Sequence, residues 1–142
     1  GIIISCFDDT GLQQAREISL CPVLGIGEAS FIFSNLHAGQ TAIITTVYEA
    51  VPVIEKNIEN SGYQNQINEV IAADVEVLEL EFNPAESAMK FALASKLLKP
   101  NTKNIILGCA GAVRIRDEFE DITGFRAFDG VTSAAKLCRA LA

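Results

Sequence analysis

The feature that most constrains the fold is a regular alternation between short, almost continuous apolar runs and longer amphipathic stretches. The apolar runs are rich in β-branched residues, which is typical of parallel strands covered on both faces. We predict strands over residues 2–7, 40–45, 76–81, 104–108 and 125–128. Helices are predicted over residues 12–18, 28–36, 47–60, 63–72, 84–98, 112–119 and 132–141. The alternation predicts an α/β fold of parallel sheets with right-handed crossovers and helices on both faces.

Local signals mark several helix ends. Asn83 is placed to cap a helix beginning at Pro84, because proline is favoured at the first helical position. Pro52 indicates that its helix begins near this residue or is kinked there. Asp129 can cap the last helix, and the GIGEAS stretch predicts a tight turn with Glu28 at a helix start.

Composition narrows the class of protein. With 142 residues, 49% apolar and 20% charged, the chain is expected to form one globular domain. The net charge of −7 without a basic cluster argues against nucleic-acid and membrane partners. No apolar run is long enough to cross a bilayer, and no basic leader precedes the first strand. We therefore expect a cytoplasmic protein that acts on a small molecule.

Two of the four cysteines follow predicted strands. Cys6 ends the first apolar run, and Cys109 ends the run NIILG. In open parallel sheets the ligand crevice lies beyond the carboxyl ends of the strands, so these thiols can meet in one crevice. The strand–Cys–helix order at residues 2–18 and 104–119 suggests a pseudo-twofold pair of small flavodoxin-like halves, the first incomplete.

The two thiols have different expected environments. Cys109 is followed by Ala110 and Gly111 at a predicted helix start, so we expect the helix dipole to lower its pKa. Cys6 is followed by Asp8 and Asp9, whose charges disfavour a neighbouring thiolate. One thiol and one thiolate are what a two-base proton exchange requires.

Other polar residues have simpler interpretations. A strand-end cysteine is often a packing residue, and we expect Cys21 and Cys138 to be structural. Thr45 and Thr46 offer hydroxyls for an anion, or an ordinary helix cap. The only histidine, His37, lies near a predicted helix end and is expected at the surface. Without Cys-x-x-Cys pairs, the chain is not expected to hold a structural zinc ion.

Five ordered motifs carry a family resemblance. The stretches IISCFDDTGLQQARE, PVLGIGEAS, AIITT, LGCAG and DGVTSAAKL resemble the hydantoin racemase branch of the aspartate/glutamate racemase superfamily. The resemblance covers essentially the whole chain and implies a cofactor-free, metal-free isomerase that forms a homo-oligomer. It also implies that a further N-terminal stretch with an Asn-Pro-Asn-like motif is missing from the first lobe.

The resemblance assigns roles to particular residues. Cys6 and Cys109 match the two cysteines that flank the substrate's stereocentre and act as an acid/base pair. The matching substrate-binding positions are Phe7, Asp8, Thr45, Thr46, Ala110 and Gly111. It further implies one racemase domain over residues 1–142, with a first lobe made of 1–39 and 125–142 and a second lobe of 40–124.

Several functions remain open at this point. The leading hypothesis is racemisation or epimerisation beside a carbonyl in a hydantoin- or allantoin-like ureide. Amino-acid racemases and maleate isomerases share the scaffold, and the presence of both cysteines disfavours a single-thiol arylmalonate decarboxylase. A ligand-binding remnant without activity is the alternative from another class.

Overall fold

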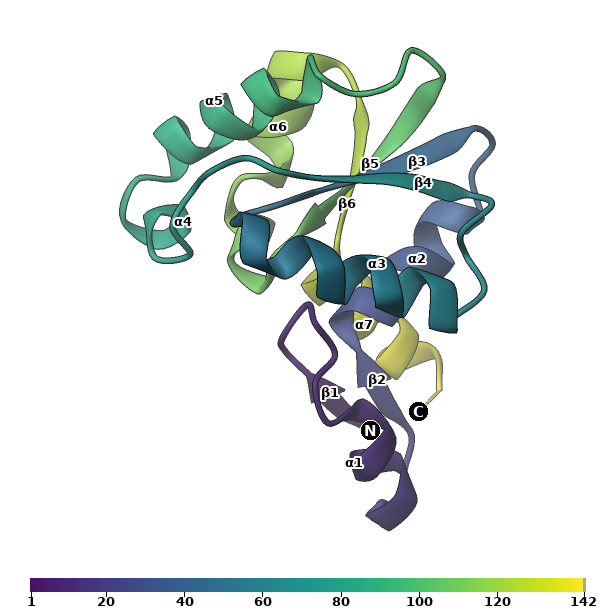
Figure 1. Ribbon diagram of the computed structural model, residues 1–142. Helices are drawn as coiled ribbons and strands as arrows, with labels where there is room; N and C mark the ends of the chain where they lie inside the picture. The colour runs from purple at the N-terminus through teal and green to yellow at the C-terminus, as the bar shows by residue number, and fades with distance from the viewer. Residues whose placement is uncertain (142) are drawn as a thin grey trace.

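The chain forms two parallel sheets of unequal size (Figure 1). A computed structural model describes residues 1–141. The smaller sheet pairs β1 (Ile2–Ile4) with β2 (Val23–Gly25). The larger sheet has the order β4-β3-β5-β6 and consists of β3 (Gln40–Thr45), β4 (Ile67–Ala72), β5 (Thr102–Gly108) and β6 (Arg126–Asp129). All pairs are parallel, as predicted, so the carboxyl ends of neighbouring strands lie at a common edge.

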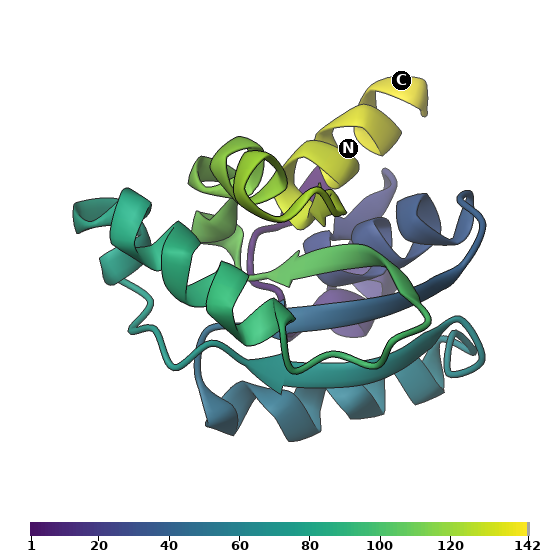
Figure 2. The same cartoon turned by 90° about the horizontal axis from the view of Figure 1, so that it is seen from above.

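Helices cover both faces of the larger sheet (Figure 2). One face carries α5 (Pro84–Ser95) and α6 (Arg116–Thr123), beside the short α4 (Glu79–Phe82). The opposite face carries α2 (Ile26–Asn35), α3 (Val51–Asn60) and α7 (Gly130–Ala140). The remaining elements are α1 (Leu12–Ile18) and two 3₁₀ helices, η1 (Tyr48–Ala50) and η2 (Ala110–Arg114).

The core divides into two apolar clusters separated by the larger sheet. Ala42 and Ile44 of β3 pack into the cluster beneath α5 and α6. Ile43, the residue between them, packs into the cluster beneath α2, α3 and α7. Successive side chains of a strand point to opposite faces, so a continuous apolar run fills both clusters. The predicted class, a parallel α/β fold with helices on both faces, is confirmed.

Two predicted elements are wrong in type. Residues 63–72 were expected to be helical, but Ile67–Ala72 forms β4 and pairs with β3. Pairing with a buried neighbour outweighs the intrinsic helix preference of its Glu and Ala residues. Residues 76–81 were expected to be a strand, but Glu79–Phe82 forms α4. The alternating pattern also fits a single helical turn, in which only Leu80 is fully buried.

The first lobe also differs in detail from the prediction. The first strand ends at Ile4 instead of residue 7, and β2 was not predicted. The assignment of residues 125–142 to the first lobe stays a prediction. Within this range, the segment 126–140 is divided in space. Its strand β6 pairs with β5 in the larger sheet, whereas α7 packs on α2 and contacts β1 and β2.

The predicted helix ends agree with the structure. Helix α5 begins at Pro84, and α3 begins at Val51 with Pro52 in its first turn. Asp129 caps α7, since its carboxylate accepts the backbone N–H of Thr132 at 2.7 Å. The other oxygen of this buried carboxylate accepts a bond from Arg116 at 3.1 Å, which connects α6 to α7.

Candidate active site

Cys6 lies in the loop between β1 and α1, where its side chain is exposed. The loop turns sharply, because Asp9 adopts a positive φ of 51° and donates its N–H to the carbonyl of Cys6. This left-handed region is uncommon for non-glycine residues, although aspartate adopts it more readily than most. The contacts that hold the loop are therefore part of how Cys6 is presented.

The carboxylate of Asp9 provides the first of these contacts. It accepts the N–H groups of Gly27 at 3.1 Å and Glu28 at 2.7 Å, which are otherwise unpaired at the start of α2. A β-carbon at Gly25 or Gly27 would collide with this carboxylate. The GIG sequence is thus the place where the Asp9 carboxylate closely approaches the backbone, whereas the sequence predicted only a tight turn there. Burial raises the pKa of Asp9 to about 6 despite these bonds.

The loop is also attached to the larger sheet. Asn57 of α3 donates its side-chain N–H to the carbonyl of Asp8 at 2.7 Å. The Phe7 ring is buried and packs edge-to-face against Phe31, with the centroids 6.2 Å apart. Phe7 belongs to the same apolar cluster as Ile106 of β5. Cys6 is therefore held between contacts to both sheets, and sequence reasoning found neither the Asp9 nor the Asn57 contact.

Cys109 directly follows β5 and precedes η2, with its side chain half-buried. Burial raises its pKa above the ordinary value of 9.0. The backbone N–H groups of Gly111, Ala110 and Ala112 act in the opposite direction but do not overcome burial. The predicted lowering of this pKa is therefore wrong, because the desolvation of the thiolate outweighs the favourable amides.

The two thiols act on one another electrostatically. The charge of a Cys6 thiolate contributes to the raised pKa of Cys109, although the residues are far apart in sequence. Both views show the loop after β1 near the end of β5 (Figures 1 and 2). Close like charges favour a state in which only one group is ionised. The arrangement can therefore hold one thiol and one thiolate.

The predicted threonines lie at the end of β3, beside Gly108 of β5. The Thr45 hydroxyl is fully buried and donates its proton to the Gly108 carbonyl at 2.9 Å. Thr46 is also buried, and within residues 1–141 its hydroxyl makes no hydrogen bond. Gly111 lies against Leu80 of α4, where a β-carbon would be 3.2 Å from the leucine side chain.

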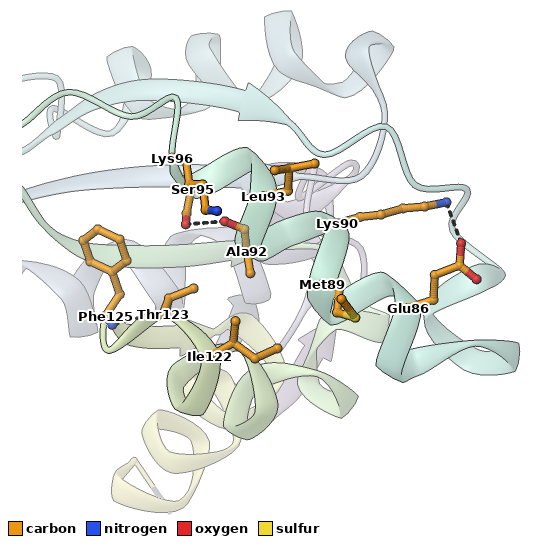
Figure 3. Close-up of a pocket in the computed structure, with 10 residues that line it drawn as sticks. All are labelled: Glu86, Met89, Lys90, Ala92, Leu93, Ser95, Lys96, Ile122, Thr123 and Phe125. Atoms are coloured by element: carbon orange, nitrogen blue, oxygen red, sulfur yellow. Dashed lines mark hydrogen bonds and ion pairs between the residues drawn. The ribbon is translucent and has the colours of Figure 1, made fainter.

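The remaining cysteines lie apart from this loop pair. Cys21 is exposed in the connector before β2, and Cys138 is half-buried on α7, facing the backbone of Gly1. In the described part of the chain, no three His, Cys, Asp or Glu side chains are grouped as metal ligands. None of the helices described is long and apolar enough to cross a membrane. A cavity of about 720 Å³ between α5 and α6 (Figure 3) has neither Cys6 nor Cys109 in its lining.

Comparison with solved structures identifies the class of fold. The chain superposes on the allantoin racemase from Pseudomonas fluorescens with a TM-score of 0.92 and 26% identity, covering 98% of this chain and 60% of that one. It also superposes on glutamate racemase RacE1 from Bacillus anthracis with a TM-score of 0.73. That match has 16% identity, covers 97% of this chain and 56% of the other, and supports the fold alone. The fold is that of the racemase class suggested by the motifs.

Sequence comparison gives the family. The family profile described as Asp/Glu/hydantoin racemase matches residues 1–138, and the chain belongs to this family. The hydantoin racemase of Rhizobium meliloti is 36% identical over 141 residues, which are 98% of this chain and 58% of that protein. The predicted resemblance to the hydantoin and allantoin racemase branch is confirmed. The chain thus spans somewhat over half the length of the relatives it matches.

Proposed function

We propose that this chain is the catalytic part of a racemase or epimerase that inverts a carbon next to a carbonyl. The proposed substrate is a small ureide such as a hydantoin or allantoin. The observation that carries the proposal is that Cys6 and Cys109 follow the carboxyl ends of β1 and β5, in loops that lie near one another in both views (Figures 1 and 2). Family membership and the similarity to hydantoin and allantoin racemases support it.

The proposed reaction is a proton exchange between opposite faces of the substrate. A thiolate removes the α-proton, the electron pair moves into the adjacent carbonyl as an enolate, and the opposite thiol donates a proton to the other face. After the reaction the two cysteines have exchanged protonation states: the former thiolate is a thiol, and the former thiol is a thiolate. Burial raises the pKa of Cys109 and favours its protonated thiol, so we propose Cys109 as the proton donor of the resting enzyme.

The enolate needs hydrogen-bond donors at its oxygen. The backbone N–H groups of Ala110 and Gly111 already face the Cys109 side chain, and the Thr46 hydroxyl is free. Thr45 holds the end of β5 through its bond to Gly108, so its proposed contribution is to position this edge. Phe7 is buried, and only its backbone and that of Asp8 are proposed to meet the substrate. The proposed reaction uses no metal or organic cofactor.

Isotope exchange with each enantiomer separately tests the proposal. Each enantiopure hydantoin is incubated in D₂O with the wild type, Cys6→Ser and Cys109→Ser. We expect each single variant to lose racemisation by roughly a thousandfold or more, since a positioned proton-transfer group contributes about 10²–10⁴-fold. Each variant should still exchange the α-proton of one enantiomer, and the retained enantiomer should differ between them. The assay is run on this chain and on a chain extended to the length of its relatives.

Two controls make the result specific. Cys21→Ser and Cys138→Ser should retain the wild-type rate, because these thiols lie outside the proposed pair. A Cys6→Ser protein that exchanges both enantiomers as well as the wild type would refute the two-base mechanism. A loss of activity in Cys138→Ser comparable to that in Cys109→Ser would show that the proposed pair of cysteines is wrong.

The cellular setting and assembly are also proposed on the family resemblance. We infer that the protein works in the cytoplasm, where its four cysteines remain reduced. No nucleic-acid or membrane partner is proposed for this acidic chain. We also infer a homo-oligomeric state.

A further inference from the structure

The start of α2 is capped by a residue from a different segment of the chain. Asp9, in the loop after β1, accepts the N–H groups of Gly27 and Glu28, which lie 18 and 19 residues further along. A helix start is ordinarily capped by the residue directly before it, as Asp129 caps α7. The residue before α2 is Gly25, which has no side chain to serve as a cap. The bond from Asp9 therefore joins the loop after β1 to α2.

The backbone at the start of α2 leaves room for this carboxylate. Gly25 has a φ of −90°, which any residue can adopt, so the backbone conformation does not require glycine. The three atoms nearest to a β-carbon at Gly25 would be the carboxyl carbon and the two carboxyl oxygens of Asp9, all in collision with it. At Gly27, a β-carbon would also collide with the backbone carbonyl of Phe7. The approach of Asp9 is therefore the reason that residue 25 must be a glycine.

A closed turn connects Asp9 to Cys6. The Asp9 N–H donates to the Cys6 carbonyl at 3.0 Å, and the Asp9 carbonyl accepts the N–H of Leu12 at 3.1 Å. A turn closed over three residues keeps the α-carbons at its ends within about 7 Å. The carbonyl of Phe7, directly after Cys6, lies against Gly27. A displacement of the Asp9 carboxylate is therefore transmitted to Cys6 through a few backbone atoms.

The donors that hold the Asp9 carboxylate are rigid. Within residues 1–141 this carboxylate accepts hydrogen bonds from backbone N–H groups only. Arg16, the cation whose charge acts on Asp9, pairs instead with Glu28. Long cationic side chains lose entropy when they are held in one geometry, whereas the N–H groups of a helix start are already fixed by the helix. The half-buried carboxylate is therefore held at a defined place beside α2.

We propose that Asp9 is a positioning residue for the reaction, because its bonds to the first turn of α2 hold Cys6 in place opposite Cys109. The inference rests on the proposed function, in which these two cysteines are the acid/base pair. Asp9 acts through the Cys6 thiol and does not itself touch the substrate. A misplacement of about 1 Å can slow a reaction roughly a hundredfold, so loss of the contact should slow the proton transfer that uses Cys6.

Isotope exchange with each enantiomer tests the role of Asp9 in the reaction. Asp9→Asn keeps the size of the side chain and tolerates the left-handed backbone, but it offers one acceptor oxygen instead of two. We expect kcat for racemisation to fall roughly tenfold to a hundredfold, with KM within about twofold of the wild type. Exchange of the α-proton should fall only for the enantiomer whose exchange is lost in Cys6→Ser. In a Cys6→Ser chain, Asp9→Asn should cause no further loss.

The matched control is Asp129→Asn, which changes the other capping aspartate, at the start of α7. This variant should lose stability but keep the wild-type ratio of exchange between the two enantiomers. Circular dichroism checks that both variants are folded at the assay temperature. A loss of exchange in Asp9→Asn that is equal for the two enantiomers would overturn the proposal, and so would a further loss in the double variant with Cys6→Ser.

A bridging reagent tests the placement of the thiols without requiring activity. Dibromobimane becomes fluorescent when it joins two thiols, and Cys21→Ser with Cys138→Ser leaves only Cys6 and Cys109 in the chain. In this background Asp9→Asn should slow bridging roughly tenfold or more, because the effective concentration of one thiol at the other falls. Bridging at the rate of the parent chain would overturn the proposal.

The glycine before α2 gives a second variant for the same measurement. Gly25→Ala should slow bridging as Asp9→Asn does, because its β-carbon displaces the carboxylate. In an Asp9→Gly chain the colliding group is absent, so adding Gly25→Ala should cause no further change; a further change would contradict the proposal. A parent chain that is bridged in an Asp9-dependent way but does not racemise would refute the proposed function alone. A parent chain that is not bridged would refute both.

Discussion

The two sheets of this protein are stabilised in different ways. In the larger sheet, the central residues of β3 and β5 are fully buried between two apolar clusters. In the smaller sheet, Ile2 and Ile3 of β1 are 44% and 37% exposed. The larger sheet thus depends on apolar burial on both faces, the dominant favourable term in folding, whereas in the smaller sheet β2 is buried and β1 is largely exposed.

Polar contacts compensate in the smaller sheet. Arg16 of α1 donates to the carbonyl of Val23 in β2 at 3.1 Å and pairs with Glu28 of α2. The Asp9 carboxylate accepts backbone hydrogen bonds at the start of α2. Cys6 is positioned by this polar network and Cys109 by the apolar sheet, so the proposed acid/base pair joins regions of different stability. We expect local opening to begin in the loop that carries Cys6, because regions with few buried apolar contacts open most easily.

The largest expected effect comes from disturbing the apolar core of the larger sheet. Phe91 of α5 is fully buried, and Phe91→Ala should lower the free energy of unfolding by about 3–5 kcal/mol, through lost burial and an added cavity. Urea denaturation followed by circular dichroism measures the change. Phe82→Ala is the control, since Phe82 is 70% exposed and should change stability by no more than about 0.5 kcal/mol. Equal losses of unfolding free energy in the two variants would contradict the expected difference between a core and a surface phenylalanine.

A smaller effect is expected from the polar contacts of the first lobe. Asp9→Ala leaves two N–H groups at the start of α2 without their acceptor and should cost about 1–2 kcal/mol. Hydrogen exchange should locate the loss in α2 and the loop after β1, with β3 and β5 unaffected. Asp8→Ala is the control, because its carboxylate accepts no hydrogen bond within the described residues.

The same carboxyl predicts a pH dependence. The pKa of Asp9 is about 6 in the folded protein, above its ordinary value of 3.8, so the folded state favours the protonated form. Its contribution to stability is therefore fully present below about 4 and is lost as pH rises through 6. Unfolding curves are recorded for the wild type and Asp9→Asn between these pH values. The free energy of unfolding of the wild type should fall relative to that of Asp9→Asn as pH rises from about 4 through 6. A difference that is constant with pH would contradict the raised pKa.

The hydrogen bond from Asn57 of α3 to the loop after β1 is expected to make a modest contribution to stability. Asn57→Ala removes one hydrogen bond to the Asp8 carbonyl and should cost about 1 kcal/mol. Hydrogen exchange at the loop after β1 should increase more than exchange in α3 itself. Asn60→Ala, at the exposed end of the same helix, is the matched control. Increased exchange throughout α3 would indicate a general loss of helix stability instead.

The smallest expected effect is a difference between Cys109 and Cys21 in their rates of alkylation. Cys109 is half-buried with a raised pKa, so iodoacetamide should modify it slowly at neutral pH and increasingly fast as pH rises through 9 and above. Cys21 is exposed and should react sooner at neutral pH. Mass spectrometry of peptides after timed labelling measures both rates. Rapid labelling of Cys109 at neutral pH would mean that the neighbouring amides outweigh burial.

Much of the fold and part of the site could be predicted from local patterns. The continuous apolar runs around Ile43 and Ile106 indicated buried parallel strands, and both cysteines were recognised by their positions after such runs. Helix starts at Pro84 and after Asp129 also followed from neighbouring residues. These features depend on backbone geometry and side-chain periodicity within a few residues, which the sequence states directly.

Other features were decided only by the tertiary structure. The segment Ile67–Ala72 became a strand because β3 was available to pair with it, and the GIG sequence acquired its role because Asp9 approaches it. The pKa of Cys109 rises although its sequence context favours a thiolate. Pairing, close approach and desolvation all depend on residues distant in sequence, and their free energies exceed the local preferences that a sequence reveals.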